Sequence, residues 1–303
     1  MSDVPAPPDT PDPERRPFTK GHGTENDFVL LPDLDGTLDL TPAQVRALAD
    51  RRAGIGGDGV IRVVPTASSQ EPDVRSQAAA AAWFMDYRNA DGSPAQMCGN
   101  GTRVFAAYLR REGLVTDDEF DIATRSGVKR IRVTSDGFAT NLGPWQVPHR
   151  DQLRTRGYDT LVALPGHDPL PALSLDLGNP HAVVALPEGF DLEGVDLTAA
   201  PELNPSVAQG CNVELAQPLG PGHLRMRVHE RGVGETRSCG TGAAAAALAI
   251  MLWSGEPAEN ERWRVDVPGG TLHVAALPGN EVELSGPAVL VADGFVTLAA
   301  RES

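Results

Sequence analysis

Two stretches of the chain, Met85–Leu109 (MDYRNADGSPAQMCGNGTRVFAAYL) and Met226–Ile250 (MRVHERGVGETRSCGTGAAAAALAI), decide the fold because they are copies of one unit. They align without a gap, and the alignment places Cys98 over Cys239. Each copy reads as a strand, a polar turn, Cys-Gly-x-Gly and a helix. Self-similarity at one fixed spacing indicates a duplicated structural unit.

The repeat continues on both sides of this stretch. Three further pairs of segments match in the same order: Asn26-Asp-Phe-Val with Asn179-Pro-His-Ala-Val, Gly57-Asp-Gly-Val with Gly210-Cys-Asn-Val, and Thr140-Asn-Leu-Gly-Pro with Glu283-Leu-Ser-Gly-Pro. We therefore expect an α+β chain of two pseudo-symmetric domains, 18–143 and 144–287, with 288–303 returning to complete the first. Residues 1–17 are mostly Pro, Asp and Arg, which predicts a disordered tail.

Helices and strands can be placed from hydrophobic periodicity. The helix expected at 101–112 carries an apolar stripe that leaves Arg103, Arg110 and Arg111 outside it. The helix expected at 242–253 is apolar on every face and must be covered on every face. The segment 65–82 reads as a long surface loop. Strands are expected at 60–64, 83–87, 129–133, 225–228, 263–267 and 271–274. Each domain should be a mixed, mostly antiparallel β-sheet rolled around a central helix.

Composition indicates which binding partners are disfavoured and which cellular location to expect. The 303 residues carry a formal net charge of −15, which argues against a nucleic-acid or anionic-membrane partner. No apolar run is long enough to cross a bilayer. The N-terminal residues lack the apolar core of a signal peptide, so we expect a cytoplasmic location. Three cysteines without Cys-x-x-Cys spacing or a nearby His cluster predict neither a disulfide framework nor a metal site.

The chemistry predicted for the repeat centres on Cys98 and Cys239. Each precedes a helix start, where unpaired N–H groups favour an anion. Such a position can lower a thiol pKa and can also bind a substrate carboxylate. Two thiols brought together by the duplication could remove a proton from one face of a carbon and return one to the other, inverting its configuration. Cys211 lacks the Gly-x-Gly and aligns with Asp58, so we expect it to be buried and inert.

Two alternatives remain at this point. Cys98 and Cys239 could be inert buried residues, or they could form a reversible disulfide that acts as a redox switch. The second is compatible with catalysis, because thiols close enough to share one carbon can oxidise.

Successive motifs of the chain resemble the signatures of the diaminopimelate epimerase family. They are, in family order, Lys20-Gly-His-Gly-Thr-Glu-Asn-Asp-Phe, Tyr87-Arg-Asn-Ala-Asp-Gly-Ser, Met97-Cys-Gly-Asn-Gly, Gly178-Asn-Pro-His, Gly210-Cys-Asn-Val and Glu230-Arg-Gly-Val-Gly-Glu-Thr-Arg-Ser-Cys-Gly-Thr-Gly. The resemblance implies an enzyme that interconverts LL- and meso-diaminopimelate without pyridoxal phosphate or metal, on the path to lysine and the peptidoglycan cross-link. It also implies a homodimer.

The resemblance implies roles for individual residues. Cys98 and Cys239 would be the acid/base pair, with Cys239 the base towards the LL substrate. Glu230 and His181 would tune the thiol pKa values. The expected substrate-binding residues are Asn26, Asn89, Gly99, Asn100, Asn179, Asn212, Glu230, Arg231, Gly240 and Thr241.

Plainer explanations exist for several of these residues. Asn89 and Asn212 could be turn-forming residues. His181 could be a surface histidine whose hydrogen bonds are already made, and Arg231 could be a solvated loop residue. We interpret His22 and Asp27 as structural.

Two positions depart from the family pattern. Many members have Gln where this chain has Gly59, so another side chain or water must replace it if that Gln contacts substrate. Glu25 stands where a small residue is common.

Rival functions share the fold or the thiols. Proline and hydroxyproline racemases typically have His where this chain has Asn100, and a phenazine-biosynthesis-type isomerase would lack the thiols. A non-catalytic amino-acid-binding protein would not need two duplicated cysteines, and a thiol-redox protein is disfavoured by the absence of Cys-x-x-Cys.

Overall fold

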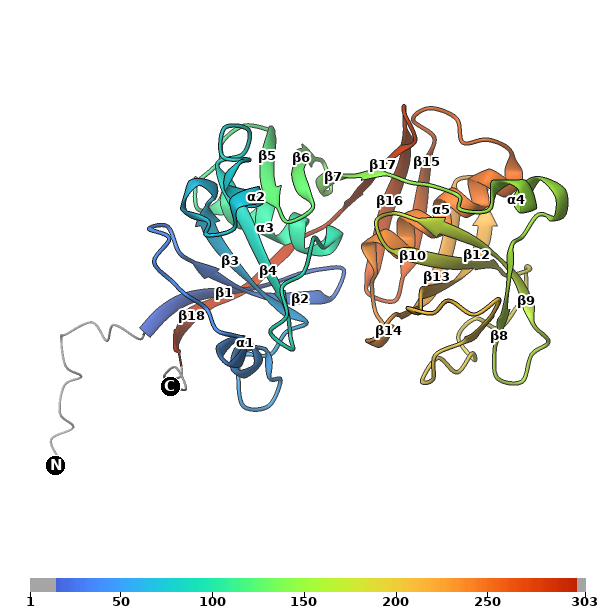
Figure 1. Ribbon diagram of the computed structural model, residues 1–303, viewed down its shortest axis with the longest axis horizontal. Helices are drawn as coiled ribbons and strands as arrows, with labels where there is room; N and C mark the ends of the chain where they lie inside the picture. Colours follow the sequence, from blue (N-terminus) through green and yellow to red (C-terminus); the bar gives the residue numbers. More distant parts are fainter. Residues whose placement is uncertain (1–14, 299–303) are drawn as a thin grey trace, which may run out of the picture.

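The computed structural model describes residues 15–298, which form two lobes, each with strands wrapped around one long helix (Figure 1). The first lobe contains β1 Arg15–Gly23, β2 Asn26–Pro32, α1 Pro42–Ala49, β3 Gly59–Pro65, η1 Thr66–Ser68, α2 Pro72–Arg75, β4 Trp83–Asn89, α3 Gly99–Arg111, β5 Glu119–Thr124, β6 Gly127–Thr134, β7 Gly137–Pro144 and β18 Val289–Thr297. The second contains α4 Arg150–Arg156, β8 Thr160–Ala163, β9 Leu170–Asp176, β10 Pro180–Ala185, β11 Glu202–Asn204, β12 Asn212–Gly220, β13 His223–Glu230, β14 Gly234–Thr236, α5 Gly240–Ser254, β15 Arg262–Val267, β16 Gly270–Leu277 and β17 Glu281–Gly286.

The expected fold class is confirmed. Most strand pairings are antiparallel, and the parallel ones are β2–β3, β4–β5, β10–β12 and β13–β15. The strand β1 begins at Arg15, so the expected tail extends too far, and its residues 1–14 lie outside the described part of the chain.

The duplication is visible in the register of the strands. Phe28 pairs with Gly59 across parallel β2 and β3, and the matching residues His181 and Asn212 pair across β10 and β12. Likewise Ile61 pairs with Tyr87, while Glu214 pairs with Val228. Since register sets which face each side chain occupies, residues matched by the repeat occupy equivalent places in the two lobes.

Two strand pairings show where the chain crosses between the lobes. β7 lies antiparallel to β17, with Thr140 opposite Leu284, so one strand of each lobe joins a shared ladder. The C-terminal strand β18 returns to the first lobe and pairs with β1 (Figure 1).

The central helices begin at Gly99 and Gly240, two residues earlier than expected, because Cys98 and Cys239 serve as their N-caps. Every residue of α5 from Ala243 to Leu252 is buried, as its uniformly apolar sequence requires. The expectation for Arg103 is wrong, since this side chain is fully buried in the first lobe. No helix between residues 15 and 298 has the length and apolar character needed to span a membrane.

The segment 65–82 is less exposed than a surface loop. It contains η1 and α2, and Val74 and Ala81 pack into a small core with Phe84. Glu71 forms an ion pair with Arg125 of the β5–β6 connection. The segment therefore covers the outer side of β4, the strand that carries Asn89.

Candidate active site

The two thiols cap the two central helices in the same way. Cys98 and Cys239 both have extended backbones, and their sulfur atoms accept hydrogen bonds from Gly101 N at 3.5 Å and from Gly242 N at 3.4 Å. Helix N-termini leave N–H groups without intrahelical acceptors. Each sulfur therefore lies against the positive end of its own helix.

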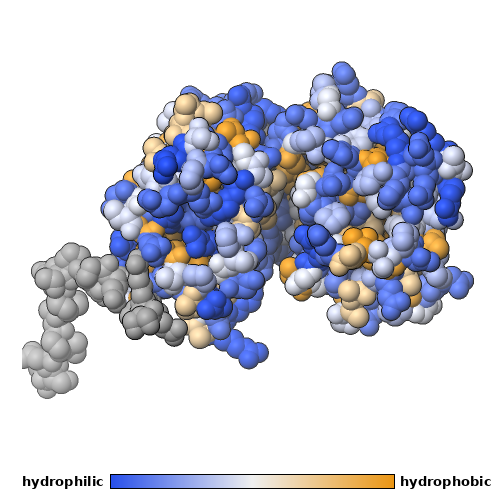
Figure 2. Space-filling model, viewed as in Figure 1, coloured by the Kyte–Doolittle hydropathy of each residue, from blue (hydrophilic) through white to orange (hydrophobic). Residues whose placement is uncertain are grey.

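The helix starts meet between the lobes. The Asn100 side-chain amide donates to the carbonyl oxygen of Ser238, the residue before Cys239, at 3.1 Å. The surface is hollowed between the lobes on the face shown in Figure 2. The duplicated thiols are thus brought to one region, as the repeat predicts, and both are free cysteines.

Matched asparagines flank the thiols. Asn26 Oδ1 accepts from Asn100 Nδ2 at 3.2 Å and lies 3.6 Å from the Cys98 sulfur. In the second lobe, Asn179 Nδ2 donates to Thr241 Oγ1 at 3.4 Å, and Thr241 Oγ1 lies 3.6 Å from the Cys239 sulfur. The structure therefore assembles these expected site residues as two related clusters.

The expectation of lowered thiol pKa values is wrong for the protein without substrate. Burial raises the pKa of Cys98 to about 11, with the Glu230 charge also raising it and the Gly101 N–H opposing. Burial raises the pKa of Cys239 well above its usual value, followed by the charges of Glu230 and Glu214. Desolvation of a thiolate here outweighs the helix N-terminus.

A buried acid–base pair lies beneath Cys239. His181 Nδ1 is 2.7 Å from Glu214 Oε1, and both side chains are fully buried. His181 Nε2 is 3.0 Å from Asn179 Oδ1. A Cβ added to Gly242 would lie 2.8 Å from Glu214 Oε1, which places this carboxyl group against the first turn of α5. His181 is therefore buried rather than on the surface.

The Glu230 charge raises the pKa values of both Cys98 and Cys239. Its own pKa is raised by burial, while a hydrogen bond from Thr236 opposes that shift. His181 acts less directly, since its charge lowers the pKa values of Glu214 and Glu230.

The remaining expected binding residues make contacts within their own or neighbouring loops and strands. Asn212 Oδ1 accepts from Arg231 N at 2.9 Å, and Asn212 Nδ2 donates to Pro180 O at 3.3 Å. Asn89 Nδ2 donates to Ser93 Oγ at 3.1 Å within a turn. The Arg231 side chain is exposed beside Gly210. These contacts fit a turn-forming role and leave the substrate-binding role as a prediction.

Other expectations concern residues near the site. Cys211 is buried, and burial raises its pKa to about 12. Asp27 forms ion pairs with Lys20 and Arg51, which agrees with a structural role. Glu25, at positive φ in the turn between β1 and β2, forms an ion pair with Arg237 of the second lobe. Residues 15–298 contain no group of three or more side chains suited to hold a metal ion.

Sequence reasoning missed two charged residues beneath the helix starts. Glu214 lies on the apolar strand β12, where its counterpart is Ile61. Arg103 donates to Gly99 O at 3.1 Å and Asn100 Oδ1 at 2.9 Å, and none of residues 15–298 forms an ion pair with it. A charge inside an apolar run of one repeat copy, opposite an apolar residue in the other, was the available signal.

A family model described as diaminopimelate epimerase matches residues 18–147 and 173–291 of the chain. The diaminopimelate epimerase of Streptomyces coelicolor is 49% identical over 91% of this chain and 94% of its own length. That of Thermobifida fusca is 49% identical over 93% and 98%, and that of Mycolicibacterium smegmatis is 43% identical over 91% and 95%.

Solved structures share the fold at low sequence identity. A hydroxyproline epimerase from Agrobacterium vitis has a TM-score of 0.65 at 13% identity, covering 95% of this chain and 94% of its own. A phenazine biosynthesis protein of the PhzF family from Bacillus anthracis has a TM-score of 0.65 at 15% identity, covering 93% and 99%. The likeness in sequence is far closer to the first group, and the chain belongs to the diaminopimelate epimerase family.

Proposed function

We propose that this protein interconverts LL- and meso-diaminopimelate, for lysine and peptidoglycan precursor synthesis, by a two-base mechanism with Cys98 and Cys239. The observation that carries the mechanism is that both thiols cap central helices whose first turns meet between the lobes. A planar carbon held between two such caps can be reached from both faces.

The reaction needs one thiolate and one thiol. The thiolate takes the α-proton of the substrate, and the electron pair of the C–H bond spreads onto the adjacent carboxylate. The opposite thiol then gives its proton to the other face of the carbon and becomes the thiolate. For the LL substrate we assign Cys239 as the base and Cys98 as the donor, and the reverse reaction exchanges these roles.

The helix starts supply the stabilisation that this step requires. The α-proton is very weakly acidic, so catalysis depends on donors aimed at the charge that develops on the carboxylate. Backbone N–H groups of Gly99, Asn100, Gly240 and Thr241 lie in the first turns of α3 and α5, where no intrahelical acceptor competes for them. The two positive helix ends also favour the negative transition state.

Because both thiols have high pKa values in the free protein, substrate binding must help to form the thiolate. In the substrate-free protein, burial disfavours a thiolate at both positions. The substrate brings an ammonium group into the same buried region, and a nearby positive charge favours a thiolate. Asn26, Asn89, Asn179, Asn212, Glu230 and Arg231 would hold the amino and carboxylate groups.

We also propose a cytoplasmic homodimer, with β18 at the interface. Among the described residues, β18 pairs only with β1, so its other edge is open. Its exposed face carries Val289, Val291 and Phe295, and Phe295 is 62% exposed. An open edge with apolar side chains is a surface that proteins usually cover. Sedimentation should give twice the monomer mass, and Phe295→Glu should lower it to the monomer mass.

Deuterium incorporation tests the proposed activity. The reduced protein is incubated in D2O separately with LL-diaminopimelate, L-proline and trans-4-hydroxy-L-proline, and deuterium at the α-carbon is followed by mass spectrometry. Epimerisation and exchange with diaminopimelate alone are expected. Exchange with none of the three would reject the proposal, and exchange with proline or hydroxyproline alone would reassign the substrate.

Three cysteine variants test the two-base mechanism. Cys98→Ala and Cys239→Ala should each abolish turnover without unfolding the protein, whereas Cys211→Ala is the matched control and should keep activity. Substantial epimerisation by either of the first two variants would rule out paired thiols.

A further inference from the structure

At two neighbouring positions, the lobe that has the polar side chain is reversed: the second lobe has it at the first position, and the first lobe has it at the second. At one matched position the first lobe has Gly59 and the second has Asn212. At a nearby position on the partner strand, the first lobe has Tyr87 and the second has Val228. The polar side chain therefore comes from β12 in the second lobe and from β4 in the first.

The structure leaves no room for a side chain at Gly59. An added Cβ would lie 2.4 Å from the carbonyl oxygen of Arg88 and 2.5 Å from Cε2 of the Tyr87 ring. Real Cβ atoms do not approach other atoms so closely, and the backbone oxygen cannot move aside cheaply. The Tyr87 ring thus occupies the space where a Gln at position 59 would begin.

The Tyr87 side chain is mostly buried, but its hydroxyl has no hydrogen-bond partner among the described residues. The side chain is 8% exposed, and its ring packs edge-to-face on Phe28 at 5.6 Å between centroids. No residue in the range 15–298 forms a hydrogen bond with the hydroxyl. The hydroxyl oxygen is also absent from the fully buried, unpaired atoms of residues 15–298, so it is accessible to a polar group of another molecule.

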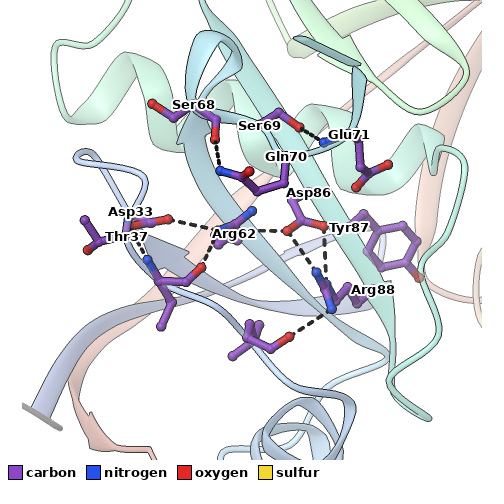
Figure 3. A network of polar contacts seen from close by, with 12 residues as sticks. Asp33, Thr37, Arg62, Ser68, Ser69, Gln70, Glu71, Asp86, Tyr87 and Arg88 are labelled. Atoms are coloured by element: carbon purple, nitrogen blue, oxygen red, sulfur yellow. Dashed lines mark hydrogen bonds and ion pairs between the residues drawn. The ribbon is translucent and has the colours of Figure 1, made fainter. Parts of the chain in front are cut away.

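The surroundings place this hydroxyl at the site. The pKa of Tyr87 is raised well above its usual value by burial, then by the charges of Cys98, Asp58 and Glu230. The hydroxyl therefore stays protonated. Cys98 packs against the cluster of side chains that contains Tyr87, which places the ring in the same region as the first thiol. Its ring points away from the network of Asp86 and Arg62 (Figure 3).

The backbone of Tyr87 is fixed from the other side of β4. Arg125 Nη1 donates to the Tyr87 carbonyl oxygen at 2.8 Å. The Tyr87 backbone is therefore held by Arg125, and its ring is held by packing on Phe28.

We propose that Tyr87 is a substrate-contacting residue whose hydroxyl forms a hydrogen bond with a polar group of bound diaminopimelate, replacing the side chain that position 59 lacks. The proposal rests on the proposed function, because it takes diaminopimelate as the substrate. It makes the first lobe equivalent to the second, where Asn212 is the polar residue at the matched position.

The test removes one oxygen atom from each of two tyrosines. Tyr87→Phe should lower kcat/KM for LL-diaminopimelate by about tenfold to a hundredfold, the range for losing a hydrogen bond to a charged group. Most of this loss should appear in KM. The control is Tyr108→Phe on α3, which is similarly buried at 5% exposure but whose pKa responds to Glu112 and Arg111 rather than to site residues. This control should keep the kcat/KM of the unmodified protein.

Thermal unfolding separates a substrate contact from a structural role. Because the hydroxyl has no partner in the free protein, Tyr87→Phe should unfold at the same temperature as the unmodified protein or higher. An unchanged kcat/KM, or a loss of activity accompanied by a lower unfolding temperature, would overturn the proposal. The unmodified protein is assayed in parallel, so failure of the proposed function appears there as absent exchange, independently of Tyr87.

Discussion

Gly99 and Gly240, the first residues of the two central helices, lie against each other. A Cβ added to Gly240 would be 3.5 Å from the Cα of Gly99 and 2.8 Å from Cδ2 of Leu284. A Cβ added to Gly99 would be 3.0 Å from the same Leu284 carbon. The second residue of each Cys-Gly-x-Gly motif is therefore Gly because the helix starts approach closely, and this approach sets the separation of the two thiols.

Gly240→Ala should separate the helix starts. Its Cβ would force Leu284 or one of the helices to move, at a cost of about 1–3 kcal/mol in the free energy of unfolding. Activity should fall by more than about tenfold, because small displacements of reacting groups have large effects on rate. Chemical denaturation and kcat/KM are the measurements.

Gly101→Ala serves as the comparison for stability. Its Cβ would make only ordinary contacts, at 3.4 Å or longer, and Ala is the better helix former. Its free energy of unfolding should be unchanged or higher. A Gly240→Ala variant with full activity and full stability would show that the helix starts tolerate separation.

Asp86→Asn tests the network that supports β4 from outside. Asp86 is 1% exposed and pairs with Arg62 and Arg88 (Figure 3). It also pairs with Arg125. Burial acts to raise its pKa, but the three guanidinium groups outweigh burial and lower it. Among residues 15–298, removing the charge leaves Arg88 without an ion pair and Arg62 and Arg125 with one carboxylate each, from Asp33 and Glu71. This loss should cost about 3–5 kcal/mol in the free energy of unfolding.

The lowered pKa of Asp86 determines how its contribution to stability depends on pH. Since the carboxyl pKa is lower in the folded state, its contribution to stability is present above the unfolded value near 3.8 and is lost as pH falls below it. Unfolding by urea at pH 7 and pH 3 should show a smaller difference between Asp86→Asn and the unmodified protein at the lower pH. Asp121→Asn, which breaks a surface pair with Arg130, should cost less than about 1 kcal/mol.

The duplicated motif made most of the fold predictable, because identical register in two copies places both thiols at helix starts. What differs between the copies was harder to predict. Glu214 and Tyr87 lie in strands whose pattern is mostly apolar, so the pattern gave no reason to expect a site residue at either position. The predicted lowering of the thiol pKa values was wrong for a related reason. A helix N-terminus is visible in the sequence, whereas the burial that outweighs it depends on how the lobes close over Cys98 and Cys239.

The Cys98 thiol of the substrate-free protein should titrate at high pH. Its pKa is raised to about 11, so the rate of alkylation by iodoacetamide, followed at the Cys98 peptide by mass spectrometry, should keep rising beyond pH 9. Because the folded pKa exceeds the unfolded one, the associated stability is complete below about pH 9 and declines as pH rises towards 11.

Glu230→Gln should move this titration to lower pH, because the Glu230 charge raises the pKa values of both thiols. Glu235→Gln is the matched control, since Glu235 pairs with Arg227 and is not among the charges that most affect either thiol. If both variants titrate like the unmodified protein, Glu230 does not tune Cys98.

Glu214 and His181 should behave as one unit with a shared proton. His181 Nε2 donates to Asn179 Oδ1, so either Nδ1 accepts a proton from a neutral Glu214 or a charged imidazole faces a carboxylate. Glu214→Gln can still donate to Nδ1 and should change the free energy of unfolding by less than about 1.5 kcal/mol. Glu214→Ala leaves His181 Nδ1 without its Glu214 partner at full burial and should cost about 3–5 kcal/mol in the free energy of unfolding.

The Glu214 charge also raises the pKa of Cys239, so Glu214→Gln should make Cys239 alkylate at lower pH while Cys98 keeps its profile. Equal shifts at both thiols would mean that the pair acts on the whole site rather than on Cys239, and equal stability of the two variants would mean that the buried proton is not shared.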